Sequence, residues 1–577
     1  MNLPHDALTV ALTGQLAFIL IVSTVFSFAV SVALLRRYRR AVVKSMRRRA
    51  YDKSLDATEL PKAPVQQPPE TDLTVNFLSS ASKPAEEAAP LPLYDQALRR
   101  PWHLALVYGF AGCLFAATMA IAFLSATKIA VLPLRFLSVA LTFFWPAVLT
   151  TWLIAAQDRR SKLLVVTAYF VLLGTISVYA LLKSPALTPV QITFFWLMTN
   201  LPPTVLAAAF LHRRIRAVGP LVLVFMIFGF TGANILVSFI GQRPELLRAV
   251  GGIAFRFGFG AQTVFYGLHF IGFLPMALLG WLVLLRLRAR YEQKKLSDQS
   301  IIIGAIWLLF AITCSIGLTF EGKWWIMSGL GAFLVFNYSA RLAFPGLGRL
   351  QKNPVESPRL LLLRVFALGR RSEHLYHALG AKWRTIGSIQ MIAGPDLTTT
   401  TLEPHEFLDF LSGKLARRFI DSARTLDLRI TEMDLHADQD GRFRVSEFFC
   451  HDDTWKMTLA RLADQSDAVL MDLRSFSAKN AGCIFEINEL FNLVLIARVV
   501  FVIDKTTDEA FLRESVQQAW RQMKPRSPNR PLPATVNIVR LENAVEVDAV
   551  LMALCKAVTA MPRATTPHPF IPSTQSI

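Results

Sequence analysis

The chain has 577 residues, of which 53% are hydrophobic, and it carries a formal net charge of +20 at pH 7. This length exceeds one ordinary domain, and this hydrophobic content exceeds that of a typical soluble protein. Lys and Arg gather at the ends of long apolar blocks and form no basic stripe with interleaved aromatic residues, which argues against nucleic acid as a partner. The five cysteines are scattered without a CxxC pair, so neither a disulfide framework nor a metal site is expected.

The first apolar block predicts an uncleaved membrane anchor over residues 1–50. Residues 8–35 contain no charged side chain, and this is long enough for a helix across a bilayer. His5 and Asp6 precede the block and a basic run follows it, which is the reverse of a signal peptide. We therefore expect the N-terminus outside the cell and the basic end in the cytosol. Residues 51–98 are rich in proline, which predicts a disordered or polyproline linker.

Eight further apolar blocks predict a multi-pass transmembrane domain over residues 99–350. Basic residues end the third, fifth, seventh and ninth predicted spans, where a nine-span topology places the cytosol. The chain is thus expected in the lipid bilayer of the cell (inner) membrane, with its C-terminal domain cytosolic. Residues 246–263 contain several glycines and Arg256, which favours an interfacial or re-entrant segment. The eight blocks are residues 102–125, 130–156, 163–183, 190–211, 217–240, 264–288, 299–320 and 324–344.

Few polar side chains interrupt these blocks. Asn200, Asn234 and His269 are the candidate membrane polar sites, because polar groups deep in a bilayer are costly and often functional. A side chain that is simply bonded to a neighbouring helix is the alternative for His269. Neither an acid–base chain nor an inverted repeat is evident in the sequence, so the spans could transport a solute or only anchor the chain.

From residue 358 onwards the pattern predicts a soluble α/β domain, over residues 355–561. Short apolar runs alternate with helical stretches, which is typical of a mainly parallel sheet with helices on both faces. The tail, residues 562–577, is rich in Pro, Ser and Thr and is predicted to be disordered. Strands are predicted at residues 359–368, 388–393, 426–430, 443–449, 468–473, 499–503 and 535–539.

The loops around these strands supply the candidate ligand-binding residues, because ligands of such sheets bind at the carboxyl ends of the strands. The pair Arg370–Arg371 at a helix start could meet a phosphate, and a solvated helix start is the alternative. No GxGxxG or GxxxxGK[ST] motif follows the first strand, so neither a dinucleotide fingerprint nor a P-loop is predicted. The candidates are Arg370, Arg371, Gly394, Asp396, Asp472, Arg474, Asn480 and Asp504.

Two short stretches could be taken for metal or nucleophile sites. Residues 436–441 nearly fit a calcium loop, but a hairpin turn at Asp440-Gly441 is the favoured interpretation. Residues 450–453 place Cys, His and two Asp side chains together, and we interpret Asp453 as the N-cap of the following helix.

One stretch resembles the Toll/interleukin-1 receptor (TIR) domain family. A predicted helix ends at Ser466, a buried strand ends at Asp472, and the next helix opens with Cys483-x-x-Glu486 and continues to Leu490. This order is similar to the helix, strand and Trp-Cys-x-x-Glu-Leu-like signature of that family. The sequence departs from it in having Gly482 where the family has Trp, and residues 397–450 look like an insertion.

The resemblance implies a TIR/flavodoxin-like three-layer fold for the cytosolic domain, beside a polytopic helical membrane domain. In enzymatic members of the family a glutamate on this helix takes part in cleaving NAD, and the matching residue is Glu486. It would then be catalytic, with NAD or another nucleotide bound. The alternative is a first-turn acid stabilised by the helix dipole.

Three functions stay open at this point. The first is a sensing or signalling protein that binds a nucleotide-type ligand or forms a homo-oligomer through its cytosolic domain. The second is a transporter or channel with a regulatory α/β domain. The third is a membrane-bound hydrolase of a nucleotide glycosidic bond.

Overall fold

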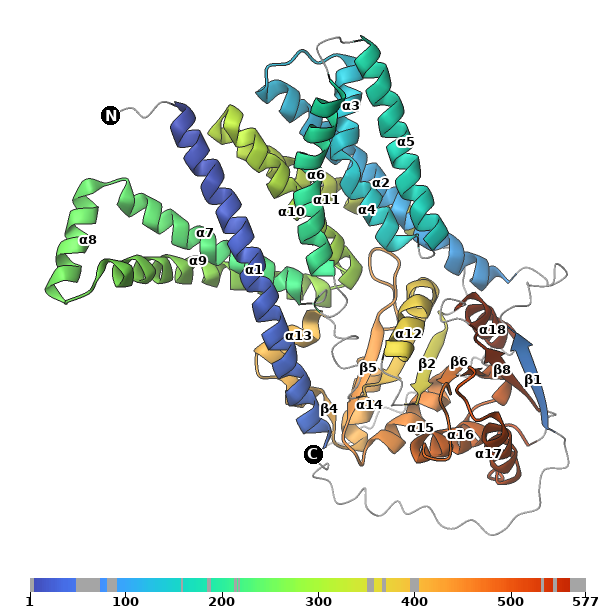
Figure 1. Ribbon diagram of the computed structural model, residues 1–577. Helices are drawn as coiled ribbons and strands as arrows, with labels where there is room; N and C mark the ends of the chain where they lie inside the picture. The colour runs from blue at the N-terminus through green and yellow to red at the C-terminus, as the bar shows by residue number, and fades with distance from the viewer. Residues whose placement is uncertain are drawn as a thin grey trace, which may run out of the picture.

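The protein consists of a group of long helices and a parallel β-sheet domain that lie against each other (Figure 1). The computed structural model describes residues 5–47, 73–79, 91–156, 159–183, 188–211, 215, 218–349, 357–365, 370–394, 404–530, 534–542 and 547–560. The predicted tail over residues 562–577 and most of the predicted linker lie outside these ranges.

The first part of the chain is helical, and its helices suit a membrane protein. Seven of the described helices are long and apolar enough to cross a membrane, and the pair α3 and α4, bent by 42°, would make eight. Many of their apolar side chains point outward, as a lipid environment permits. The helices are α1 (His5–Met46), α2 (Pro92–Ala126), α3 (Pro133–Phe143), α4 (Trp145–Ile154), α5 (Arg159–Lys183), α6 (Pro189–Leu211), α7 (Gly219–Gly241), α8 (Pro244–Arg256), α9 (Ala261–Glu292), α10 (Asp298–Leu318) and α11 (Met327–Arg349).

The expected count of nine spans exceeds this set by one helix. Helix α11 has 23 residues, but Asn337 and Arg341 lower its hydropathy and it is not among the span-like helices of the described chain. Helix α8 occupies much of the segment predicted to be interfacial. Its 13 residues would reach about 20 Å, which is less than the roughly 30 Å of a hydrocarbon core.

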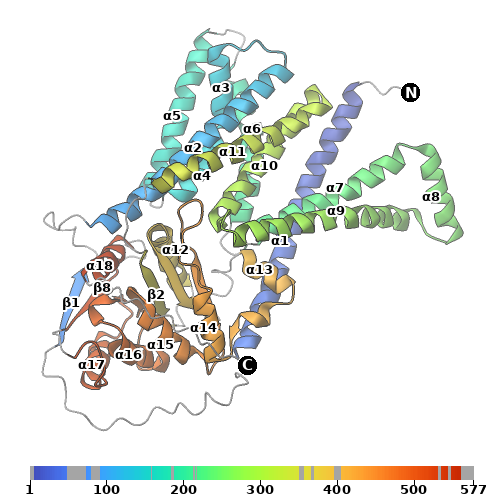
Figure 2. The same ribbon diagram turned by 180° about the vertical axis from the view of Figure 1, so that it is seen from behind.

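Helices α7, α8 and α9 form an arm that projects away from the other helices in both views (Figures 1 and 2). Gly232 and Gly272 allow α7 and α9 to approach closely, because a Cβ at Gly272 would lie 2.7 Å from the carbonyl oxygen of Gly232. Small residues at such crossings are the usual means of close helix packing in membranes.

The sheet has eight strands in the order β1-β8-β7-β6-β2-β3-β5-β4, and every pair is parallel. The strands are β1 (Leu73–Ser79), β2 (Arg359–Arg364), β3 (Ser388–Ile392), β4 (Phe419–Ile420), β5 (Val445–Cys450), β6 (Ala468–Asp472), β7 (Val499–Ile503) and β8 (Ala534–Arg540). The accompanying helices are α12 (Arg370–Trp383), α13 (Pro404–Leu411), α14 (Ala423–Thr431), α15 (Trp455–Gln465), α16 (Ala481–Leu493), α17 (Glu509–Arg521) and α18 (Val547–Ala560).

Apolar side chains cover both faces of the sheet, as the continuous hydrophobic runs predict. In β2, Leu361 and Leu363 face one core cluster with α15, α16 and α17, whereas Leu360 and Leu362 face another with α12 and α18. The prediction of a parallel sheet with helices on both faces is therefore confirmed.

The strand order differs from the flavodoxin-like order that the sequence suggested. Without the edge strand β1 and the two-residue β4, the order is β5-β3-β2-β6-β7-β8, or 3-2-1-4-5-6 in chain order. A flavodoxin-like sheet has the order 2-1-3-4-5. The difference arises because residues 397–450, interpreted as an insertion, contain β4 and β5 and extend the sheet beyond β3.

Some local predictions were wrong. Asp453 is not the N-cap of α15, because Thr454 takes that position and its side chain makes no capping hydrogen bond. Residues 73–79 of the predicted linker form β1, which pairs with β8 along its whole length. Residues 426–430 belong to α14 and not to a strand, because a capping box between Ser422 and Thr425 starts a helix there. Asp440 and Gly441 form a turn in a long loop before β5 and no hairpin, because β5 pairs in parallel with β3 and β4.

The end of α1 docks on the sheet domain. Tyr38 is fully buried and meets the ring of Phe410 edge-on at 5.4 Å, within an apolar cluster that includes Phe419. The carbonyl oxygen of Met46 accepts a hydrogen bond from the amide of Asp452 at 3.1 Å. The two ends of the sheet are thus completed by segments from the start of the chain, α1 at the β4/β5 side and β1 at the β8 side.

Candidate functional site

The carboxyl ends of β2 and β6 lie side by side where the strand order reverses, and polar side chains gather there. Asp472, the last residue of β6, is fully buried and accepts hydrogen bonds from Arg474 Nε at 2.7 Å and Nη2 at 2.6 Å. Ser372 Oγ donates to the same carboxylate at 3.2 Å, and Arg474 Nη2 also donates to the carbonyl of Arg371 at 3.0 Å. Asp472 and Arg474 therefore bind each other and join the start of α12 to the end of β6.

Arg371 is an exposed cation of this edge. Its Nη2 forms an ion pair with Asp504 Oδ2 at 2.6 Å, while 47% of its side chain stays exposed. Nη1 lies 3.4 Å from Thr506 Oγ1 and 3.5 Å from Ser475 Oγ, and these two hydroxyls are 2.8 Å apart. Ser475 has a left-handed backbone φ of 60°, a conformation that residues other than glycine rarely adopt. A guanidinium and two hydroxyls on an exposed edge are suited to an anionic group.

The other predicted ligand-binding residues take different places. Asn480 precedes α16, and its Oδ1 accepts from the amide of Ser477 at 2.9 Å, so it closes a turn. Gly394 is buried just after β3. Arg370 begins α12, but its side chain lies outside the described part of the structure, as does all of Asp396.

Glu486 lies inside the sheet domain on α16. It is only 3% exposed, and Oε2 has no hydrogen-bond partner among the described residues. Burial raises its pKa to about 8, against a smaller lowering by the charge of Arg364. The carboxyl group is therefore protonated at neutral pH and shielded from solvent. Cys483, one turn before Glu486 on α16, lies close to the end of β2, since its thiol is 3.8 Å from the carbonyl oxygen of Arg364.

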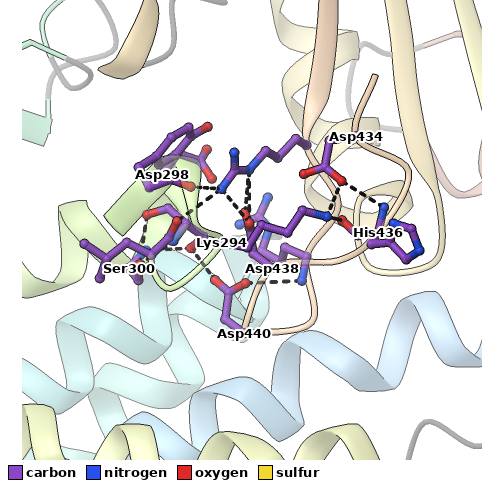
Figure 3. A network of polar contacts seen from close by, with 12 residues as sticks. Lys294, Asp298, Ser300, Asp434, His436, Asp438 and Asp440 are labelled. Carbon is purple, nitrogen blue, oxygen red and sulfur yellow. Dashed lines mark hydrogen bonds and ion pairs between the residues drawn. The ribbon is translucent and has the colours of Figure 1, made fainter. Parts of the chain in front are cut away.

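A second polar cluster, which we call the joint, connects the sheet domain to the helices (Figure 3). Arg384, directly after α12, binds both carboxylate oxygens of Asp298 at the start of α10, with Nη1 and Nη2 each at 3.0 Å. Its Nε donates to the carbonyl of Phe443 at 2.7 Å, and the amide of Phe443 donates back to the Arg384 carbonyl at 2.7 Å. The planar guanidinium thus fixes the helix end, the loop before β5 and α10 together.

Residues 434–444 form the rest of the joint. Arg444 binds Asp438 with Nη2 at 2.7 Å, donates to the Tyr291 carbonyl at 2.5 Å and stacks over the Tyr291 ring at 3.9 Å. Burial raises the pKa of Asp438 to about 6, although Arg444 opposes this. Asp440 accepts from Ser297 Oγ, and Lys294 pairs with Asp434 (Figure 3).

The joint was not predicted from the sequence, because residues 436–441 were interpreted only as a calcium loop or a hairpin turn. The acidic side chains of this loop bind residues of the turn between α9 and α10. Gly441, with a φ of 78°, allows the backbone of the loop to reverse direction. The available signal was charge: an acidic loop in one part of the chain and a basic turn, which includes Lys294 and Lys295, in another.

The candidate membrane polar residues are bonded within or near their own helices. Asn200 is fully buried, and its Nδ2 donates to the Thr142 carbonyl of α3 at 3.0 Å and to the Trp196 carbonyl at 3.2 Å. Asn234 bonds to the carbonyl four residues before it, and His269 does the same with its Nδ1. The Oδ1 of Asn200 has no hydrogen-bond partner among the described residues, and none of these hydrogen bonds joins two of the three side chains.

The chain therefore combines helices that are long and apolar enough to cross a membrane with a doubly wound parallel sheet domain packed against them. Comparison of the chain with protein-family models, with curated proteins and with solved structures finds no match in any of the three.

Proposed function

We propose that this protein is a membrane-embedded sensor whose sheet domain binds an anionic, nucleotide-type ligand at the carboxyl edge of β2, β6 and β7. The observation that carries the proposal is the group of Arg371, Ser475 and Thr506 at this edge. Ligands of doubly wound sheets bind where the strand order reverses, and this group lies beside that point. The ligand class is also what the resemblance to the TIR family implies.

Helix α12 supplies a route from the ligand to the membrane. Arg371 lies in the first turn of α12. Arg384 directly follows the last residue of α12 and forms a two-point ion pair with Asp298 of α10. A helix of 14 residues spans about 21 Å, so one rigid element links the proposed ligand edge to a span-like helix. A ligand that draws Arg371 away from Asp504 would alter the start of α12, and the joint would pass the change to α10.

We further propose that α11 is a ninth span and that the sheet domain lies in the cytosol. The basic residues at the sheet-facing ends of the helices support this orientation, because such residues collect on the cytosolic side. Arg286, Arg288 and Arg290 at the end of α9 are among them.

The test uses the full-length chain in detergent, titrated with NAD, ATP and inorganic phosphate, with binding measured by calorimetry. Arg371→Gln should weaken nucleotide binding about tenfold or more, since a charge-assisted contact contributes about 1.5–3 kcal/mol. Arg521→Gln is the matched control, because Arg521 is exposed at the end of α17 on another surface.

Three results would redirect the proposal. If no nucleotide binds to a folded sample, or if both arginine variants bind alike, the carboxyl edge is not the ligand site. NAD turnover that disappears in Glu486→Ala would make the chain a hydrolase instead. To test coupling, hydrogen exchange at the start of α10 should change on ligand binding in the parent protein and not in Arg384→Gln.

A further inference from the structure

A cavity of about 310 Å³ lies beside the joint, between the first turns of α2, the end of α12 and the loop before β5. This volume is at the lower end of the roughly 300–1,000 Å³ of pockets that hold small ligands. We propose that the cavity binds the headgroup of an anionic phospholipid that carries free hydroxyl groups. This site is separate from the proposed nucleotide site at the carboxyl edge and does not depend on it.

The basic side of the cavity comes mainly from α2. Arg99 and His103 are one helical turn apart and both line the cavity, so their side chains share one face of α2. Both side chains are exposed, and Arg442 lines the cavity from the loop before β5. Arg100 also lines it, and its guanidinium is held by the carbonyl of Thr385. Arginines that converge on one cavity are suited to the phosphate of a headgroup.

The cavity also presents acceptors that a bare phosphate would leave unused. Gln299 lines it, is only 6% exposed, and its Oε1 has no hydrogen-bond partner among the described residues. A buried amide oxygen without a donor is costly, so a ligand hydroxyl there would restore a lost hydrogen bond. Asp440 is a second acceptor in the lining. A headgroup such as that of phosphatidylglycerol would place its phosphate against the arginines and its adjacent hydroxyls against these acceptors.

The position of the cavity favours a lipid over a soluble anion. It lies where α2 leaves the sheet domain and enters its apolar stretch, and Leu104 and Ile154 of the span-like helices complete its wall. Trp102 beside it is 41% exposed, and tryptophan is typical of the membrane–water interface. Basic pockets between helices at this level are where anionic headgroups bind.

The test uses the full-length chain in detergent and counts bound lipid by native mass spectrometry. The probes are dioctanoyl phosphatidylglycerol, dioctanoyl phosphatidic acid, dioctanoyl phosphatidylcholine and inorganic phosphate. Phosphatidylglycerol should bind best, and Arg99→Gln should weaken it about tenfold. Arg290→Gln is the control: this exposed arginine at the end of α9 is outside the cavity lining, and its loss should change binding less than twofold.

Gln299→Met tests the hydroxyl contact separately. It keeps the side-chain size and removes the acceptor, so the preference for phosphatidylglycerol over phosphatidic acid should disappear while phosphatidic acid binds as before. Equal binding of phosphatidylcholine, equal effects of the two arginine variants, or binding of inorganic phosphate as tight as that of the lipid would each overturn the proposal. Because nucleotides are absent from this experiment, its result is independent of the carboxyl-edge proposal.

Discussion

Replacement of Glu486 by glutamine should stabilise the protein at neutral pH and have little effect in acid. The side chain is 3% exposed, and burial raises its pKa from 4.5 to about 8. A carboxyl group whose pKa is raised by folding contributes its full stability below pH 4.5, and loses it as the pH rises through 8. Glutamine cannot ionise in either state, so its variant escapes this loss.

The magnitude follows from the shift itself. At pH 7 the unfolded chain gains about 3 kcal/mol from ionising this group while the folded chain keeps it neutral, and the difference grows to about 5 kcal/mol above pH 9. For a domain of this size, 3 kcal/mol corresponds to a rise in unfolding midpoint of roughly 6–12 °C. We expect Glu486→Gln and the parent to unfold together near pH 4 and to separate progressively above it.

The assay is thermal unfolding of the full-length chain in detergent between pH 4 and pH 9. Glu514→Gln on α17 is the control, because Glu514 is exposed and its replacement should change stability by less than about 0.5 kcal/mol at any pH. A Glu486→Gln variant that is less stable than the parent at pH 7 would refute the reasoning. It would mean that Glu486 is ionised in the folded protein and stabilised by Arg364.

Three further substitutions test other parts of the structure by the same unfolding assay. Arg384→Gln should cost about 1.5–3 kcal/mol because it removes both guanidinium hydrogen bonds from the half-buried carboxylate of Asp298. Asp298→Asn in the same chain should recover part of the loss, and an additive loss would contradict this. Gly272→Ala should cost about 1–3 kcal/mol because its Cβ would lie 2.7 Å from the backbone of α7, whereas Gly174→Ala, with nothing within 4 Å, should be neutral or better. Ser475→Gly should change stability by less than about 1 kcal/mol, because relief of the left-handed φ of 60° is offset by loss of the hydrogen bond to Thr506. It should weaken nucleotide binding, measured by calorimetry, and unchanged binding would remove Ser475 from the site.

Local pattern was enough to predict the buried strands of the sheet. The run over residues 499–503 is wholly apolar and forms β7, buried along its length. Strand β1 was not predicted, although residues 73–77 alternate apolar and polar side chains as a half-buried strand does. The prolines around this segment favoured a linker instead, and in the structure the strand is held by its parallel pairing with residues 534–540.

The candidate site was predicted in outline but not in its pairings. The rule that loops after parallel strands converge did bring Arg371 and Asp504 together. The rule could not predict that Asp472 and Arg474 would form an ion pair with each other, because that depends on the side-chain rotamers after β6. The charges of the joint were visible in the sequence, but the pairing of Arg384 with Asp298 was not, because only the docking of two parts of the chain brings them together.

The pairing of β1 with β8 has a consequence for biogenesis. Residues 73–79 leave the ribosome long before residues 534–540, and at about 5–20 residues per second the delay is roughly 20–90 s. During that time the span-like helices are synthesised, and residues 73–79 have no partner strand for their backbone groups. The prolines that flank this strand on both sides would discourage premature pairing with other chains. A fragment that begins after the helices would lack both β1 and α1, and would expose both edges of the sheet to aggregation.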